Sequence, residues 1–514
     1  MGIKDNALVV MENNGPSNSI TATGNGPSGI SLSYLLSGYR PYLAAGAVHP
    51  NPILLSKLEE AKHLSIIDQD LEYLSEGLEG RSSNPVAVLF DTLLHPNADF
   101  GYEYPSVLQW RLEKQQHIPH LVLGKGTPGG AWHAMEGSML TISLGIWMEL
   151  PGFNYRDLAQ GKQRNVINDR ATPEEISSYY KNYIKLMGLQ KNFVNNTYVT
   201  SILKLHRGQE EETDNEGRGE AVESKPQLAE KEDNGPTEFS QTTWEVRGYQ
   251  RVQDGSHVPF CFCAENVVLA TGASDSPARL DVEGEDLPFV SHCITDLGAA
   301  ISKRSLSQSS DPLLIVGAGL SAADAVLCAY NNNISILHVF QKRVDDPSLI
   351  FKQLPKMLYP EYHKVYHMMC TQSPAAASIL YPDYSSFPEH CVVSFQPDMK
   401  CVLQSASSFQ VFKISMALVQ IGTHPNLFFV KDQGKYLGLD TKKAISCKHN
   451  PLDIHPYTFE CTKEANLFSM GPLIGDNFVR FLKGGALGIT SCLVKRLKKK
   501  GKLIADGGGG GGIA

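Results

Sequence analysis

Apolar runs that lead into a glycine-rich turn and then into apolar residues at helical spacing occur twice along the chain. The clearer case begins with Leu313–Val316, a continuous apolar run typical of a strand buried on both faces of a parallel sheet. The turn at 317–322 follows with the spacing G-x-G-x-x-A, and apolar positions at 322, 323, 325, 326 and 329 then mark one helix face. The pattern predicts a strand, a tight turn and a helix.

The same arrangement occurs near the amino terminus in weaker form. Ser19–Thr23 is expected to form a short strand although it is less apolar, and a helix is expected from Ile30 to Ser37. Between them Gly24–Gly29 has the spacing G-x-G-x-x-G. A single match of this kind also fits an ordinary glycine-rich turn, so the flanking strand and helix carry the prediction.

Between these units the pattern predicts a helical insertion over 39–117, including a helix over 105–116. A further helix is expected over 173–187, with Thr172 as its N-cap. Further strands are expected at Ile118–Leu123, Trp244–Tyr249 and Val267–Ala270.

Together these elements predict an α/β fold with two Rossmann-like dinucleotide-binding domains and a helical insertion. We expect the first domain to comprise 1–282 and 416–514, and the second to comprise 283–415. Within the first, the acidic stretch 207–240 and the glycine-rich end 507–514 are predicted to be disordered, because they bury too little apolar surface to order their backbone.

The small residues of both turns are candidate binding residues. In such a turn the first glycine permits the tight bend, the second lets the backbone approach a diphosphate, and the third small residue lets the helix pack on the strand. The helix N-terminus adds free N–H groups and partial positive charge. Diphosphate binding is therefore expected at Gly24, Gly26 and Gly29 in one unit and at Gly317 and Gly319 in the other.

Cofactor choice can be inferred at the end of the second strand of a unit. Ile336–Phe340 is such a strand, and Lys342 and Arg343 follow it where an NAD-binding unit carries an acid. Two cations suit the 2′-phosphate of NADPH, which is the cofactor we expect here. A basic strand end that faces water is the alternative interpretation.

Composition excludes several classes of protein. The net charge is −8, which disfavours a general nucleic-acid binder. None of the ten cysteines forms a C-x-x-C pair, so neither a zinc site nor a redox dithiol is expected, and the cysteines fit a cytoplasmic protein. No apolar stretch is long enough for a membrane span.

Four further segments resemble those of flavin-containing monooxygenases and related two-dinucleotide flavoproteins. They are the G-G-x-W segment at 129–132, the A-T-G strand at 267–272, its second copy at 418–425, and the segment 467–476, which ends in Gly-Asp. More closely, the chain from Gly24 to its end resembles the oxidative stress-induced growth inhibitor family.

This resemblance implies an FAD- and NADPH-dependent, monooxygenase-like protein that uses O2 and is linked to growth inhibition, cell death and germ-cell maturation. It places FAD on Gly24, Gly26 and Gly29, with Gly130 and Trp132 beside the flavin. Asp476 would bind the ribityl chain. NADPH would bind at Gly317, Gly319, Lys342 and Arg343.

The chain departs from the monooxygenase pattern at three places. Leu123 stands where a ribose-binding Glu is usual, so that contact is either lost or supplied from elsewhere. The insertion 39–117 is longer than the usual crossover. The monooxygenase fingerprint survives only in part over 289–292, and Asp296 replaces its aromatic residue.

Several assignments keep an alternative. His292 lines a nicotinamide site or is a loop histidine satisfied by hydrogen bonds, and Trp132 stacks near flavin or packs in the core. Asp476 binds a ribityl hydroxyl or shapes a turn. The aromatic and histidine cluster at 359–367 contacts substrate or packs as a helix face, and the latter is expected. The whole protein is either a monooxygenase or a regulatory interaction protein on a flavoprotein scaffold with little turnover.

Overall fold

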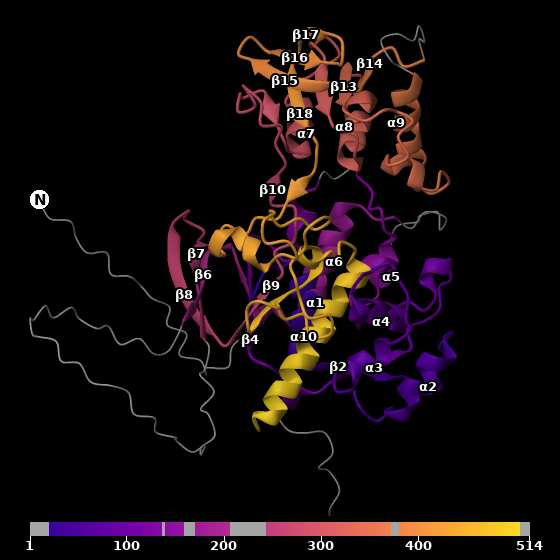
Figure 1. The fold of residues 1–514 in the computed structure, drawn as a ribbon, viewed down its shortest axis with the longest axis vertical. Coiled ribbons are helices and arrows are strands. Elements are labelled where there is room, and N and C mark those ends of the chain that lie inside the picture. Colours follow the sequence, from indigo (N-terminus) through magenta and orange to yellow (C-terminus); the bar gives the residue numbers. More distant parts are fainter. Residues whose placement is uncertain (1–19, 136–138, 159–169, 206–242, 372–379, 504–514) are drawn as a thin grey trace, which may run out of the picture.

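A computed structural model describes residues 20–135, 139–158, 170–205, 243–371 and 380–503 of the 514-residue chain. The predictions for 207–240 and 507–514 lie outside the described residues. Figure 1 shows a larger lower part that contains α1 and α10 and a smaller upper part that contains α7, α8 and α9. Each part is built on a parallel sheet.

The sheet of the larger part has five parallel strands in the order β20-β9-β1-β4-β5. These strands are β1 (Ile20–Thr23), β4 (His120–Gly124), β5 (Phe193–Asn195), β9 (Asn266–Leu269) and β20 (Leu467–Ser469). The polar first strand is fully buried, and the Thr23 hydroxyl donates to the carbonyl of Val268 at 3.3 Å. Hydrogen bonding of this kind offsets the free-energy cost of burying a threonine hydroxyl.

Helices cover this sheet and share one apolar core with it. Helix α1 (Pro27–Leu36) leaves the first glycine turn, and the long α10 (Val479–Lys499) packs against it. The helix predicted over 173–187 is confirmed as α6 (Pro173–Leu186). Thr172 is its N-cap and forms a capping box with Glu175.

The insertion is only partly helical. It contains α2 (Pro52–Glu60), α3 (Leu71–Ser75) and α4 (Pro85–Leu94). The prediction of a helix over 105–116 is wrong. The strand β3 (Leu108–Leu112) forms there and pairs antiparallel with β2 (Tyr39–Leu43). The partner strand lies far back in the sequence, so its hydrogen bonds override the local preference.

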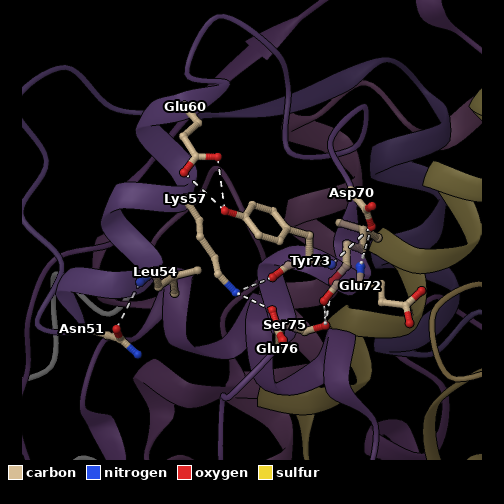
Figure 2. Close-up of polar contacts among 10 residues, drawn as sticks. Asn51, Leu54, Lys57, Glu60, Asp70, Glu72, Tyr73, Ser75 and Glu76 are labelled. Atoms are coloured by element: carbon tan, nitrogen blue, oxygen red, sulfur yellow. Dashed lines mark hydrogen bonds and ion pairs between the residues drawn. The ribbon is translucent and has the colours of Figure 1, made fainter.

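Polar contacts join the first two helices of the insertion, as Figure 2 shows. Lys57 of α2 donates to the carbonyl of Tyr73 in α3 at 2.7 Å and reaches Glu76 at 3.3 Å. The Tyr73 hydroxyl in turn donates to the Glu60 carboxylate at 3.2 Å. Asn51 and Asp70 cap the N-termini of α2 and α3. These contacts therefore hold α2 and α3 against each other.

The sheet of the smaller part is also parallel, with the order β11-β18-β12-β13-β14. Its elements are β11 (Val290–Ser291), α7 (Ile294–Ser302), β12 (Leu313–Val316), α8 (Leu320–Asn331), β13 (Ile336–Phe340), α9 (Pro360–Thr371), β14 (Tyr384–Pro388) and β18 (Met416–Val419). Alternate residues of β12 enter two separate cores, one on each face of the sheet. Because β18 pairs with β12, this sheet extends to Val419, beyond the boundary expected at residue 415.

Antiparallel ribbons complete the molecule. One sheet contains β6 (Thr197–Leu205), β7 (Thr243–Arg251) and β8 (His257–Ala264), and another contains β15 (Cys391–Gln396), β16 (Lys400–Gln404) and β17 (Phe409–Lys413). The two chain crossings between the parts pair as β10 (Ser276–Pro277) and β19 (Thr423–His424). In Figure 1 β10 lies at the narrow junction of the two parts.

Candidate functional site

A cavity of about 670 Å³ opens at the carboxyl ends of β1, β4 and β9. Three loops line it, namely the first glycine turn, the segment 123–135 after β4, and the segment 270–275 after β9. Residues from the start of α10 and from 428–429 complete the wall. This position, above the carboxyl edge of a parallel sheet, is where α/β proteins bind nucleotides, and the volume suits a cofactor.

The first turn is shaped for close approach. Gly24 has φ = +111°, and a β-carbon there would lie 2.2 Å from the carbonyl oxygen of Ala270. A β-carbon on Gly29 would lie 2.0 Å from the Gly24 carbonyl oxygen, so the third glycine lets α1 pack on the turn. At Gly26 the nearest atom is 4.0 Å away, which means that a side chain would project into open space beside the cavity. The turn therefore keeps a backbone cradle clear.

The opposite wall fits a bound group as well. Gly130 faces Gly26, since a β-carbon on Gly130 would be 3.0 Å from the Gly26 Cα. Trp132 lines the cavity half-buried and also packs on the main core, so the two interpretations of this residue are compatible. The Thr271 hydroxyl, also in the cavity wall, is buried without a hydrogen-bond partner among the described residues. An unsatisfied buried hydroxyl beside a glycine cradle fits a polar ligand.

At the end of β4 the expected acid is replaced by an apolar residue and a glycine. Leu123 is buried at 2% exposure and lines the cavity without any polar atom in its side chain. The Asn25 side chain lies over Gly124, where a β-carbon would come within 2.0 Å of it, and donates to the carbonyl of Gly126 at 2.7 Å. Leu123 therefore cannot provide the carboxylate with which a Glu at this position usually binds the ribose.

Lys125 and Asp275 form an ion pair at the cavity wall. One follows β4 and the other follows β9, and the sequence pattern singled out neither of them. A signal was available in the sequence, because Lys125 stands between Gly124 and Gly126 directly after the strand where a cofactor-reading residue is expected.

Asp476 is held by the insertion. Its carboxylate accepts hydrogen bonds from the Ser82 hydroxyl at 2.5 Å and from the Asn84 amide at 2.9 Å. Burial raises the pKa of this carboxyl to about 6, although both donors oppose the shift. Asp476 is not among the residues that line the cavity, whereas its neighbour Asn477 is. The described structure thus offers the carboxylate two partners within the protein.

The second glycine turn has the geometry of the first. Gly317 has φ = +133°, and a β-carbon there would lie 2.2 Å from the carbonyl oxygen of Gln420, while Gly319 has open space around it. His338, buried in β13, donates from Nε2 to the Gly317 carbonyl at 2.7 Å and accepts from the Tyr384 hydroxyl at 2.7 Å. Burial lowers the pKa of His338 to about 4, so the ring is neutral near pH 7 and holds this tautomer.

Lys342 and Arg343 are exposed directly after β13, beside the second turn. Lys342 donates to the Ser348 hydroxyl at 2.7 Å. Arg343 makes two hydrogen bonds with Asp345, at 2.9 and 3.0 Å. Both cations stand at the strand end where a 2′-phosphate would be read, and each already has a local partner.

Other residues that the sequence singled out have structural partners. His292 Nε2 lies 2.8 Å from the Glu285 carboxylate, and Asp296 accepts from the Ser291 hydroxyl at 2.6 Å. In the cluster at 359–367, Tyr362 donates to Asp324 at 3.0 Å and His363 Nε2 bonds the Leu354 carbonyl at 2.7 Å. These contacts fit hydrogen-bonded packing, the interpretation that the sequence favoured for the cluster.

The described part of the chain offers neither a metal-binding cluster nor a membrane-spanning helix. No group of three or more His, Cys, Asp or Glu side chains in the described part of the chain is arranged to hold a metal ion. Among the described helices, none combines the length and apolar character that crossing a bilayer requires.

Comparison with known proteins identifies the family. The chain is 65% identical over 496 residues to human oxidative stress-induced growth inhibitor 2, covering 96% of each chain. The chain belongs to the oxidative stress-induced growth inhibitor family. It is also 48% identical to mouse oxidative stress-induced growth inhibitor 1 over 94% of this chain and 96% of the relative. No protein-family model matches the chain.

Solved structures share the fold at low identity. Bacillithiol disulfide reductase from Bacillus cereus superimposes with a TM-score of 0.54 at 13% identity, covering 93% of this chain and 99% of that chain. The Staphylococcus aureus enzyme of the same name gives the same score and identity, covering 94% of this chain and 99% of its own. The predicted α/β fold with two Rossmann-like domains is thereby confirmed.

Proposed function

We propose that this protein is a flavin-dependent oxidoreductase that binds FAD on the first glycine turn and NADPH on the second. The observation that carries the proposal is the cavity at the first turn. There a cradle free of side chains faces Gly130 and the Thr271 hydroxyl, which has no hydrogen-bond partner within the described part of the chain. The second turn repeats the backbone geometry. Solved proteins of this fold that carry the name disulfide reductase support a redox role.

Each residue has a defined task in this proposal. Gly24, Gly26 and Gly29 bind the FAD diphosphate through the backbone and the N-terminus of α1. Gly130 and Trp132 lie on the flavin side. Gly317 and Gly319 bind the NADPH diphosphate, and Lys342 and Arg343 exchange their local partners for the 2′-phosphate. Asp476 would bind the ribityl chain only if it released Ser82 or Asn84.

When bound, FAD supplies the redox chemistry, since a flavin accepts a hydride from NADPH and reacts with O2 as monooxygenases require. The protein contributes binding and exclusion of water. The N-terminus of α10 places Asn477 and Val479 at the cavity, so its partial positive charge favours negative charge developing there. We place this activity in the cytoplasm. We propose that it contributes to growth inhibition, as the relatives' names indicate, and to cell death and germ-cell maturation, as the resemblance to the family implies.

Colour tests this proposal directly. Purified protein given FAD should be yellow, and NADPH should bleach it in the absence of air. Gly319→Val should remain yellow and resist bleaching, because its side chain meets no neighbouring atom and enters the space that the NADPH diphosphate would occupy. A wild-type protein that takes up neither nucleotide in excess contradicts the proposal, and so does a Gly319→Val variant that bleaches normally.

Two observations favour a second candidate function. Leu123 offers no ribose contact, and the Asp476 carboxylate is satisfied inside the protein by Ser82 and Asn84. Both features would weaken cofactor binding. A protein with this flavoprotein fold and little turnover would then act by regulating other proteins. The same titration separates the candidates, because the scaffold predicts substoichiometric FAD and no NADPH-dependent bleaching.

A further inference from the structure

The ion pair between Lys125 and Asp275 lies in the wall of the cavity at the first glycine turn. Lys125 follows β4 and Asp275 follows β9, and these two strands flank β1 in the sheet. The pair therefore joins the two loops on either side of β1, whose carboxyl end leads into the glycine turn. The turn lines the same cavity, so a diphosphate bound there would share the cavity with both charges.

Hydrogen bonds from the first glycine turn hold the backbone around Lys125 beside the cavity. Asn25, the second residue of the turn, is buried, and its amide donates to the Gly126 carbonyl at 2.7 Å. Its own carbonyl accepts from Gly129 at 2.9 Å. Because Gly124 has no side chain, the Asn25 carboxamide fits over it. Both sides of Lys125 are thus fixed to the turn while its own side chain is about half exposed, at 50%.

Charge decides what this arrangement can bind. A dinucleotide diphosphate carries negative charge, so it attracts Lys125 and repels Asp275. Both side chains keep access to solvent, at 50% and 30% exposure, so exchanging one partner for another carries no burial penalty. A phosphate oxygen would give Lys125 a charge-assisted hydrogen bond in place of the carboxylate.

We infer that Lys125 is the cation with which this cavity binds the phosphates of an adenine dinucleotide, and that Asp275 competes for it. The inference rests on the proposed function, because it deepens the assignment of FAD to the first turn. Lys125 then supplies affinity that the missing acid at Leu123 does not. Asp275 lowers the affinity by holding Lys125 and by facing the phosphates with a like charge.

Binding of FAD and of riboflavin, which has no phosphate, tests the inference by flavin fluorescence without any turnover. Lys125→Met should weaken FAD binding about tenfold, because a charge-assisted hydrogen bond to phosphate is lost. Asp275→Asn should strengthen it about threefold. Riboflavin binding should be the same in all three proteins. Raising the salt concentration from about 0.05 M to about 0.5 M should reduce the difference in FAD affinity between wild type and Lys125→Met, because salt screens the charge of Lys125.

The pair between Lys413 and Asp311, 3.1 Å apart and outside the residues that line the cavity, provides the matched control. Lys413→Met and Asp311→Asn should leave FAD binding unchanged. If Asp275→Asn weakens FAD binding as much as Lys125→Met does, the pair is a structural brace and the inference is wrong. Equal FAD binding by wild type and Lys125→Met also overturns it. A wild type that binds no FAD overturns the proposed function instead.

Discussion

Neighbouring glycines in the first turn are required for different physical reasons. Gly24 cannot carry a side chain, because its φ of +111° and the Ala270 carbonyl at 2.2 Å both exclude one. Gly26 can carry one, because its nearest neighbour is 4.0 Å away, but the side chain would enter the space that a diphosphate needs. The first glycine serves the fold, and the second serves the proposed binding of a diphosphate.

Alanine substitutions separate these two roles. Gly24→Ala should lower the free energy of unfolding by about 2 kcal/mol, because the strained backbone and the contact with Ala270 cannot both be relieved. Gly26→Ala should lower it by no more than about 1 kcal/mol, the cost of alanine at the N-cap of α1, and still weaken FAD binding. Urea unfolding and fluorescence titration measure the two effects. A stable Gly24→Ala protein would contradict this account of the turn.

Asp476 should make stability depend on pH. Its folded-state pKa of about 6 exceeds the ordinary aspartate value of 3.8, so the folded protein holds the proton more tightly than the unfolded chain. The stabilisation is complete below about pH 4 and is lost as the pH rises through about 6. Asp476→Asn, which stays neutral, should therefore gain stability relative to wild type as the pH rises above about 4, and the gain should reach about 3 kcal/mol at pH 7. Chemical unfolding across this range measures it, and a difference independent of pH would contradict it.

At the scale of elements, the sequence predicted what short-range pattern determines. The apolar run at Leu313–Val316 and the capped helix at Pro173–Leu186 formed as predicted, since neighbouring residues suffice to specify them. The segment 105–116 was mispredicted because its strand β3 depends on β2, more than sixty residues earlier. For the same reason the partners of Asp476, at Ser82 and Asn84, were beyond sequence reasoning. The glycine cradle of the site was readable, but Lys125 and Asp275 were not recognised as a pair.

Helix α10 is fixed to the insertion by a buried ion pair. Arg480 contacts Asp91 of α4 through Nε at 2.9 Å and Asp99 at 3.0 Å. Arg480→Leu should lower the free energy of unfolding by about 3 kcal/mol or more, because it leaves the buried Asp91 carboxylate without its partner. Arg156→Leu, which removes an exposed pair with Glu103, should cost less than about 1 kcal/mol. Thermal unfolding compares them, and equal losses would contradict a special role for the buried pair.

At the scale of the whole molecule, the larger and the smaller part are joined by more than the chain crossings. Arg170, with a side chain only 2% exposed, bonds the Thr141 carbonyl at 2.6 Å on one side. On the other side it reaches the Leu358 carbonyl at 3.2 Å and pairs with Glu361 of α9. Its guanidinium also lies 4.6 Å from the centre of the Tyr359 ring. One arginine thus links both parts through hydrogen bonds, charge and an aromatic face.

This link should matter for the proposed hydride transfer, because the proposed FAD and NADPH sites lie in different parts and the cofactors would react only in close contact. Arg170→Leu should bind FAD and NADPH separately with unchanged affinity. Arg170 is not among the residues that line the cavity at the first turn, and its contacts with Thr141, Leu358 and Glu361 lie outside the second turn. Flavin reduction at saturating NADPH should nevertheless slow by about tenfold, as the parts lose their fixed orientation. Lys364→Leu, which removes a contact with Tyr330 inside the smaller part, is the matched control and should reduce at the wild-type rate. Anaerobic stopped-flow absorbance measures both variants. If Arg170→Leu also reduces at the wild-type rate, then the crossings that pair as β10 and β19 are sufficient to orient the two parts.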